Sequence, residues 1–309
     1  RQRIDRGWDG ADVSGRPPSF LVIGAARSGT TYLSRALNLH PLIAVTTPKE
    51  PNFLAFGGTR QEFAGPGDER TRDSVVGDEH EWRALFDACD GVVVGEASVT
   101  TMFYPEVTVP RIQQFCPDAR LIAVLRAPWD RARSAWMLLR GQGRETLSFA
   151  DGLVAEPARI ASGFESIWHY RSQSEYARQL RPFVDAFGDR LLVLEFERMV
   201  SGADELERAF AHLGVEAAAV PDLGRVNEAS DPHFAWLRRR MATAHARPTL
   251  RRAMRAVVPA SARRSILDVL AVCDRDEPLP DGFVASFEAD LADLRGLLGD
   301  QTPRWAQPR

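Results

Sequence analysis

Short apolar runs alternate with amphipathic stretches from residue 20 to residue 194. The runs favour buried strands at 20–23, 42–45, 91–95, 121–125 and 191–194. Between them, apolar residues recur every three or four positions, which predicts helices over 30–39, 79–88, 105–115, from 130 onward and over 174–187. Strands and helices that alternate in this way are typical of a parallel sheet covered on both faces. We therefore predict an α/β fold, in which one domain has a central parallel sheet of about five strands flanked by helices on both faces.

Other parts of the chain lack this clear pattern. The stretch 57–73 is rich in glycine and charge and is expected to form a loop near the mouth of a cleft, whereas 141–163 is expected to cap the acceptor site. We divide the chain into an extended leader, a core domain and a helical, arginine-rich extension packed on the core, at 1–19, 20–230 and 231–309. The segment 232–267 has nine arginines and no acidic residue. It forms either a solvated basic surface or an electrostatic funnel for an anionic nucleotide or acceptor.

The first predicted strand leads into a glycine turn. Its sequence is Gly-Ala-Ala-Arg-Ser-Gly-Thr-Thr, at residues 24–31. Gly24 and Gly29 allow the backbone to approach an anion, while Thr30 and Thr31 fall where a helix N-terminus presents free N–H groups. The spacing matches a phosphate-binding P-loop, except that Thr30 replaces the lysine and the basic residue is Arg27. Since a nucleoside triphosphatase needs that lysine, the departure argues against hydrolysis of ATP or GTP.

A second anion site is predicted about a hundred residues further on. The strand 121–125 ends at Arg126, and a proline turn then leads into a helix that carries Ser134. A guanidinium group binds phosphate with two parallel hydrogen bonds. The alternative roles are a salt bridge between Arg126 and Asp130 at the start of the helix and, for Ser134, a buried hydroxyl group bonded to its own helix.

The two blocks, in this order, resemble those of sulfotransferases that use 3′-phosphoadenosine 5′-phosphosulfate (PAPS). The resemblance implies a P-loop-like fold and two groups of nucleotide-binding residues. The 5′-phosphosulfate would lie on Arg27, Ser28, Gly29, Thr30, Thr31 and Tyr32, and the 3′-phosphate on Arg126 and Ser134. For Thr30 and Thr31, simple capping of the helix is the alternative role.

The segment Lys49-Glu50-Pro-Asn-Phe53 follows the second predicted strand. It resembles a Lys-Glu-Pro-x-Phe segment in a sulfotransferase branch that includes heparan-type and bacterial enzymes. The resemblance implies that Glu50 is the general base and that Lys49 stabilises charge beside the phosphosulfate. The alternative is a solvent-facing pair of the two side chains. Arg27, where many family members have lysine, can bind the phosphate and the bridging oxygen, but it donates a proton less readily than lysine.

Four further residues have weaker signals. Glu96 matches a family segment near the acceptor pocket, where it would orient the acceptor or hold Lys49, although capping the next turn is equally compatible with its position. His169 lies between aromatic residues and is either a rival base or a packed structural histidine. Tyr176 fits a family position with a core-packing role, and Asn227 lies in a short match to a loop that closes over adenine.

Composition narrows the class of protein. Hydrophobic residues make up 44% of the chain and charged residues 26%, with a net charge of −3, so we expect a globular protein without general attraction to nucleic acid. No apolar run could span a membrane, and three cysteines without metal spacing favour a reduced, cytoplasmic setting. Lys49 is the only lysine against abundant arginine, which hints at a bacterial source with a strong coding bias. A homo-oligomer is compatible with this sequence.

We therefore expect a sulfotransferase that moves a sulfuryl group from PAPS, without a metal, to an acceptor hydroxyl. An amine is the less favoured acceptor group, and the acceptor molecule is a small molecule, glycolipid or glycan. Two alternatives stay open at this point: a P-loop kinase of a nucleotide or small molecule, and a non-catalytic module that binds a nucleotide or anion. The missing P-loop lysine disfavours the kinase, and Glu50 disfavours the module, because a protein that only binds has no need of a base.

Overall fold

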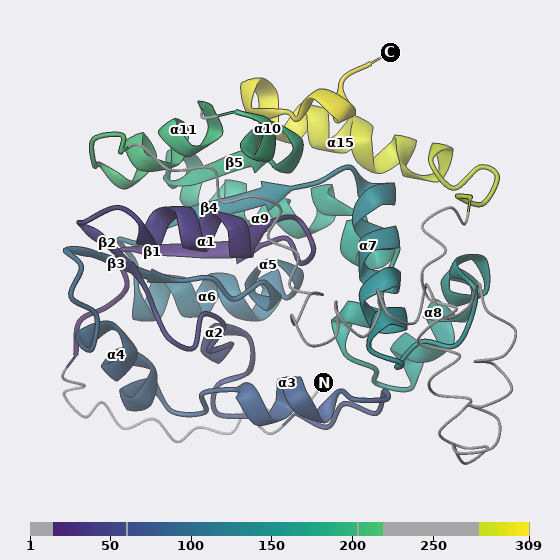
Figure 1. The fold of residues 1–309 in the computed structure, drawn as a ribbon, viewed down its shortest axis with the longest axis horizontal. Coiled ribbons are helices and arrows are strands. Elements are labelled where there is room, and N and C mark those ends of the chain that lie inside the picture. The colour runs from purple at the N-terminus through teal and green to yellow at the C-terminus, as the bar shows by residue number, and fades with distance from the viewer. Residues whose placement is uncertain (1–14, 60, 203, 219–277, 309) are drawn as a thin grey trace, which may run out of the picture.

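The computed structural model describes residues 15–59, 61–202, 204–218 and 278–308, and its strands form one five-stranded sheet (Figure 1). The order is β2-β3-β1-β4-β5, and every pairing is parallel. The strands are β1 (Phe20–Gly24), β2 (Ile43–Val45), β3 (Val93–Glu96), β4 (Arg120–Leu125) and β5 (Leu191–Glu195). The predicted α/β fold with a central parallel sheet is confirmed.

Helices connect the strands and cover both faces of the sheet. Those before β4 are α1 (Thr30–Asn38), α2 (Phe53–Phe56), α3 (Glu69–Ser74), α4 (Glu79–Asp87), α5 (Thr100–Phe103) and α6 (Pro105–Phe115). Those after β4 are α7 (Pro128–Gly141), α8 (Phe149–Ala161), α9 (Tyr176–Phe187), α10 (Phe196–Ser201), α11 (Asp204–Leu213) and α15 (Glu288–Leu298). In the part of the chain that the structure describes, no helix is long and apolar enough to cross a membrane.

The sheet separates two hydrophobic cores, because alternate residues of a strand point to opposite faces. Phe20 and Val22 of β1 pack in the core that contains residues of α1, α10 and α11. Leu21 and Ile23 pack in the other core, with residues of α4, α6, α9 and α15. This arrangement leaves the carboxyl ends of the central strands, where the predicted motifs begin, as a shared edge.

The structure differs locally from the sequence expectations. The stretch 141–163, for which the sequence predicted no element, contains the thirteen-residue helix α8, although Gly152 and Pro157 lie inside it. A Cβ atom at position 152 would lie only 3.0 Å from the Tyr170 ring, so close packing explains a glycine within this helix. The stretch 57–73, expected as a loop, contains most of α3, and α7 begins with Pro128 rather than at residue 130.

The C-terminal part of the described chain packs on the core. Gln301 covers the free edge of β5: its Oε1 accepts a hydrogen bond from Val193 N at 2.7 Å, and its Nε2 donates to the Leu191 carbonyl at 3.4 Å. The predicted basic segment 232–267, Asn227 and the proposed boundary at 230 lie outside the described residues. The division into three segments therefore stays a prediction.

Candidate active site

The loop between β1 and α1 forms a cradle with an open helix N-terminus. Arg27 and Gly29 both have left-handed backbone conformations, with φ of 69° and 89°. Only glycine fits at position 29, because a Cβ atom there would lie 2.5 Å from Cδ2 of Phe196. Helix α1 has neither a side-chain cap nor an acidic residue in its first turn. Its first N–H groups and positive dipole end are therefore available to an anion.

The two predicted phosphate motifs meet at the carboxyl edge of the sheet. Arg27 Nε donates a hydrogen bond to Ser134 Oγ at 3.3 Å. The residues are 107 positions apart, but β1 and β4 are neighbouring strands, so the loop after β1 and the helix after β4 lie next to each other. This contact joins the loop that resembles a 5′-phosphosulfate site to the helix that resembles a 3′-phosphate site.

Arg126 is held at this edge by an aromatic ring and a buried tyrosine. Its guanidinium carbon lies 5.0 Å from the centre of the Phe196 ring, and its carbonyl accepts a hydrogen bond from the Tyr176 hydroxyl at 2.9 Å. The Arg126 Nε is buried and makes no hydrogen bond with the described residues. Among the ion pairs of the described residues there is none between Arg126 and Asp130, the alternative role that the sequence left open for Arg126. A buried N–H donor of this kind favours a bound acceptor such as phosphate.

Lys49 connects the cradle to Glu50. Its Nζ donates to Thr31 Oγ1 at 3.1 Å and to Thr30 Oγ1 at 3.5 Å, and it lies 2.7 Å from Glu50 Oε1. The exposed fractions of the Lys49 and Glu50 side chains are 24% and 35%. Since such a half-exposed pair is worth only about 0–1 kcal/mol, an anion at the cradle can compete for the ammonium group.

The comparisons with known proteins identify the family. A family model described as "Sulfotransferase family" matches residues 18–219, which contain both phosphate motifs and the Lys49–Glu50 segment. The chain belongs to this sulfotransferase family. A sulfotransferase crystal structure from Alicyclobacillus acidocaldarius is 34% identical, with a TM-score of 0.65. That match covers 84% of this chain and 97% of the other.

Curated relatives are more distant. The human carbohydrate sulfotransferase 15 is 29% identical over 170 residues, covering 43% of this chain and 29% of the relative. The bovine bifunctional heparan sulfate N-deacetylase/N-sulfotransferase 2 is 29% identical over 136 residues, covering 44% of this chain and 14% of the relative. The chain thus spans less than a third of the length of either protein.

The Glu96 carboxyl group is buried. Among the described residues, no contact joins it to Lys49. The Glu96 side chain is 1% exposed and accepts a hydrogen bond from Trp82 Nε1 at 3.2 Å. Burial raises the pKa of Glu96 to about 8, and the nearby charge of Glu50 acts in the same direction. Glu96 therefore carries a proton at neutral pH and cannot serve as a base in that state.

His169 lies in an aromatic environment. Its ring centre is 5.6 Å from that of Phe103, and burial lowers the pKa of the imidazole below its usual range. No described contact joins His169 to Lys49 or Glu50, although its buried Nε2 has no hydrogen-bond partner in the described part of the chain. The packed structural role accounts for these contacts, and the rival-base hypothesis stays untested.

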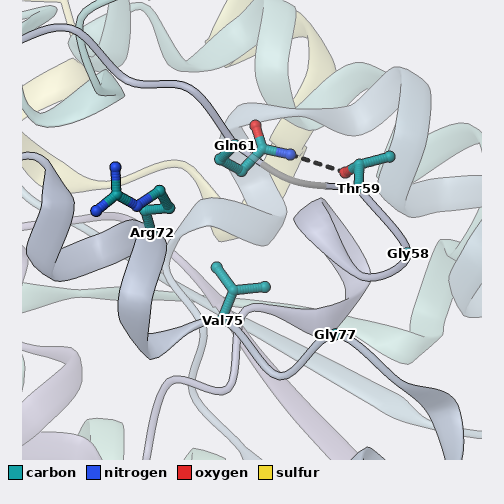
Figure 2. A pocket seen from close by; sticks show the side chains of 6 residues that line it. All are labelled: Gly58, Thr59, Gln61, Arg72, Val75 and Gly77. Carbon is teal, nitrogen blue, oxygen red and sulfur yellow. Dashed lines mark hydrogen bonds between the residues drawn. The ribbon is translucent and has the colours of Figure 1, made fainter.

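An open depression is formed by residues between 58 and 77, which follow α2 in the chain (Figure 2). It has a volume of about 340 Å³ and is lined by Gly58, Thr59, Gln61, Arg72, Val75 and Gly77. Val76 N donates to the Pro51 carbonyl at 2.9 Å, and Gly58 N donates to the Gly77 carbonyl at 2.8 Å. These bonds tie the walls of the depression to the residue next to Glu50.

The segments predicted to border the acceptor site are joined by Asp68. This fully buried carboxylate accepts hydrogen bonds from Gly65 N at 2.8 Å, Glu165 N at 2.9 Å and Trp168 Nε1 at 2.9 Å, and it pairs with Arg144. Hydrogen bonds through Asp68 therefore join the stretches near residues 65 and 165. The predicted position of 57–73 near the mouth of a cleft and the predicted role of 141–163 as a cap remain untested.

Sequence reasoning missed the residues that support Arg126. Phe196 follows β5 and showed no motif, and the predicted role of Tyr176 was packing, without its hydroxyl contact. Arg131 of α7 is fully buried; it donates to Ser174 Oγ at 2.6 Å and the Tyr170 carbonyl at 2.8 Å, and it contacts Gln173. Its position five residues after Arg126 was the available signal, but a sequence does not distinguish a buried arginine from an exposed one.

Proposed function

We propose that this protein transfers a sulfuryl group from PAPS to a hydroxyl group of a carbohydrate-containing acceptor. An amine is the less favoured acceptor group. The observation that supports this most is the set of cations around one open helix N-terminus. Lys49 contacts Thr31 and Glu50, Arg27 lies in the loop and contacts Ser134, and Arg126 stacks on Phe196, the ring that packs against Gly29. Three cations suit a donor with several anionic groups, and a single adjacent carboxylate suits a proton acceptor.

The residues of the cradle fit the donor. The N-terminus of α1, with Ser28, Gly29, Thr30, Thr31 and Tyr32 at or next to it, and Arg27 would hold the 5′-phosphosulfate. Arg126 and Ser134 would hold the 3′-phosphate; the buried Nε of Arg126 is a hydrogen-bond donor without a described partner, as such a site requires. Asn227 stays a proposed nucleotide contact outside the described residues.

Bound PAPS supplies the sulfuryl group: the acceptor oxygen bonds to sulfur while the bond from sulfur to the bridging oxygen breaks, and the electron pair stays on the phosphate. Glu50 takes the proton of the acceptor hydroxyl as that oxygen attacks. Lys49 and Arg27 stabilise the negative charge that grows on the phosphate side. The contact of Lys49 with Thr30 and Thr31 orients its ammonium group toward the cradle while it remains beside Glu50.

The depression formed by residues between 58 and 77 is our proposed acceptor surface. Its polar lining includes the Arg72 guanidinium, the Gln61 amide and the Thr59 hydroxyl, and the last two are joined by a 2.8 Å hydrogen bond (Figure 2). Such groups bind sugar hydroxyls and anionic substituents. Two of the relatives are a carbohydrate sulfotransferase and a heparan sulfate N-deacetylase/N-sulfotransferase, which agrees with a carbohydrate acceptor for this chain.

Replacing Glu50 by Gln tests the reaction, because glutamine keeps the size of the side chain but removes its basicity. We expect kcat to fall about 10²–10⁴-fold, the usual contribution of general-base catalysis, with the affinity for adenosine 3′,5′-bisphosphate unchanged. Asp118→Asn, which changes an exposed carboxylate before the amino end of β4, at the opposite edge of the sheet, is the matched control and should leave both quantities unchanged.

Each other outcome has a distinct meaning. A kcat within a few fold of wild type would exclude Glu50 as the base and make His169 the next residue to replace. Loss of nucleotide affinity together with kcat would mean that Glu50 is structural. Tight nucleotide binding by wild type without transfer to any carbohydrate, small-molecule or amine acceptor would favour the non-catalytic binding module instead.

A further inference from the structure

Helix α9 begins without a cap from its own neighbourhood. The preceding residue, Glu175, makes no side-chain capping bond, and the first turn contains no acidic residue. A helix start of this kind leaves backbone N–H groups to be satisfied from elsewhere. The cap comes from α15, more than a hundred residues away: Asp290 accepts from Tyr176 N at 2.9 Å through Oδ2 and from Ala177 N at 3.0 Å through Oδ1.

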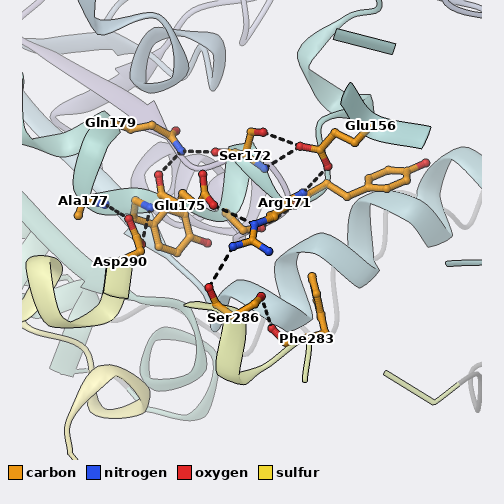
Figure 3. Close-up of polar contacts among 12 residues, drawn as sticks. Glu156, Arg171, Ser172, Glu175, Ala177, Gln179, Phe283, Ser286 and Asp290 are labelled. Atoms are coloured by element: carbon orange, nitrogen blue, oxygen red, sulfur yellow. Dashed lines mark hydrogen bonds and ion pairs between the residues drawn. The ribbon is translucent and has the colours of Figure 1, made fainter. Parts of the chain in front are cut away.

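Figure 3 shows Asp290 of the C-terminal helix facing the start of α9. Other contacts bind the same two segments together. Arg171 donates to the Ser286 carbonyl at 3.1 Å, and the Tyr176 and Trp305 ring centres lie 6.1 Å apart. From the other side, Glu156 accepts from Arg171 N at 2.7 Å and Ser172 N at 2.8 Å. The segment 170–177 is therefore fixed on several sides before it enters α9.

Two sets of hydrogen bonds connect this segment to the proposed donor site. The Tyr176 hydroxyl, on the residue that Asp290 caps, donates to the Arg126 carbonyl. Arg131, in the helix that also carries Ser134, bonds to the Tyr170 carbonyl and to Ser174. The Arg126 Nε has no described partner. The bond to the Arg126 carbonyl fixes its backbone, the Phe196 ring lies against its guanidinium group, and the Glu197 carboxylate interacts with it electrostatically.

We propose that Asp290 is a positioning residue of the donor site, which fixes Arg126 through Tyr176. Helix α15 then contributes to nucleotide recognition, although it lies outside residues 18–219, which match the family model. This inference rests on the proposed function, because it takes Arg126 as the ligand of the 3′-phosphate. It predicts that losing the cap weakens recognition of that phosphate more than recognition of the rest of the nucleotide.

The experiment compares binding of adenosine 3′,5′-bisphosphate and adenosine 5′-monophosphate by calorimetry, using the full chain. We expect Asp290→Ala to weaken bisphosphate binding about three- to tenfold, the range that loss of a helix cap allows, and to change monophosphate binding less than about twofold. Tyr176→Phe keeps the ring and removes the hydroxyl group that bonds to the Arg126 carbonyl, so it should give the same selective loss. The double variant should be no weaker than the worse single variant, because both changes interrupt one route.

Two controls define the result. Asp78→Ala removes a carboxylate that also accepts from two backbone N–H groups at a helix start, here His80 N and Glu81 N of α4, and should not alter the ratio of the two affinities. Arg126→Ala should abolish the preference for the bisphosphate. If Asp290→Ala does not fold, Asp290→Asn, which retains an acceptor oxygen, and Tyr176→Phe still decide the question.

The failures are separable. A wild-type protein that binds both nucleotides equally would overturn the donor assignment itself. A wild-type preference for the bisphosphate that survives in Asp290→Ala and Tyr176→Phe would overturn only the coupling. Equal losses for both nucleotides, or additive losses in the double variant, would show that Asp290 has a general structural role.

Discussion

Gly29→Ala tests the tightest contact of the cradle. The added Cβ atom would lie 2.5 Å from Cδ2 and 2.7 Å from Cε2 of Phe196, and the residue would keep a φ of 89° that alanine disfavours. The left-handed backbone costs roughly 1–2 kcal/mol. Forcing a methyl group into a packed site costs about 1–3 kcal/mol more. We therefore expect the free energy of unfolding to fall by about 2–5 kcal/mol.

Gly214→Ala separates the two costs. Gly214 has a φ of 76°, but a Cβ atom there would meet nothing within 4 Å, so only the backbone cost of about 1–2 kcal/mol should appear. Urea denaturation followed by tryptophan fluorescence gives both values. Equal losses in the two variants would refute the predicted clash with Phe196.

The same substitution should also affect nucleotide binding. Phe196 lies under the Arg126 guanidinium, so moving the ring away from position 29 displaces the group proposed to bind the 3′-phosphate. We expect Gly29→Ala to weaken binding of adenosine 3′,5′-bisphosphate at least about tenfold, the loss of one charge-assisted hydrogen bond, and Gly214→Ala to leave it unchanged. Unchanged affinity in a folded Gly29→Ala protein would contradict the proposed role of the cradle.

Three further predictions concern protonation, the acceptor and metal. Burial raises the pKa of Glu96 from 4.5 to about 8, so folded protein keeps a proton that the unfolded chain loses. The free energy of unfolding should therefore fall as pH rises from about 5 to 8, by up to roughly 1.4 kcal/mol per unit, and Glu96→Gln should remove that part of the slope in urea titrations. Arg72→Ala should raise KM for an acidic carbohydrate about three- to tenfold without changing nucleotide affinity; an unchanged KM would exclude the depression as the acceptor surface. Transfer should persist in excess EDTA, with no ATP hydrolysis; activity restored by Mg²⁺ would favour the kinase alternative.

Local patterns were sufficient for the elements that carry the motifs. The five apolar runs predicted the strands, and the structure moved their ends by two residues or fewer. Helix α8 was missed because Gly152 and Pro157 disfavour a helix locally. A signal was present nonetheless: Ser148 caps the helix by accepting from Asp151 N, a serine followed three residues later by an acid. Glycine has a low helix propensity, but it fits at position 152 because the helix packs closely against the Tyr170 ring there.

The sequence by itself determined the sulfotransferase family, the α/β class and the candidate residues Arg27, Lys49, Glu50 and Arg126, because strand periodicity and phosphate motifs depend on near neighbours in the chain. Tertiary structure decided how these residues are held. The Arg27–Ser134 bond, the Arg126–Phe196 stack and the Asp290 cap join residues 70 or more positions apart. Such contacts depend on which strands and helices pack side by side, and no local pattern of residues specifies them. For the same reason, the protonated state of Glu96 followed only from its burial in the core beside Trp82.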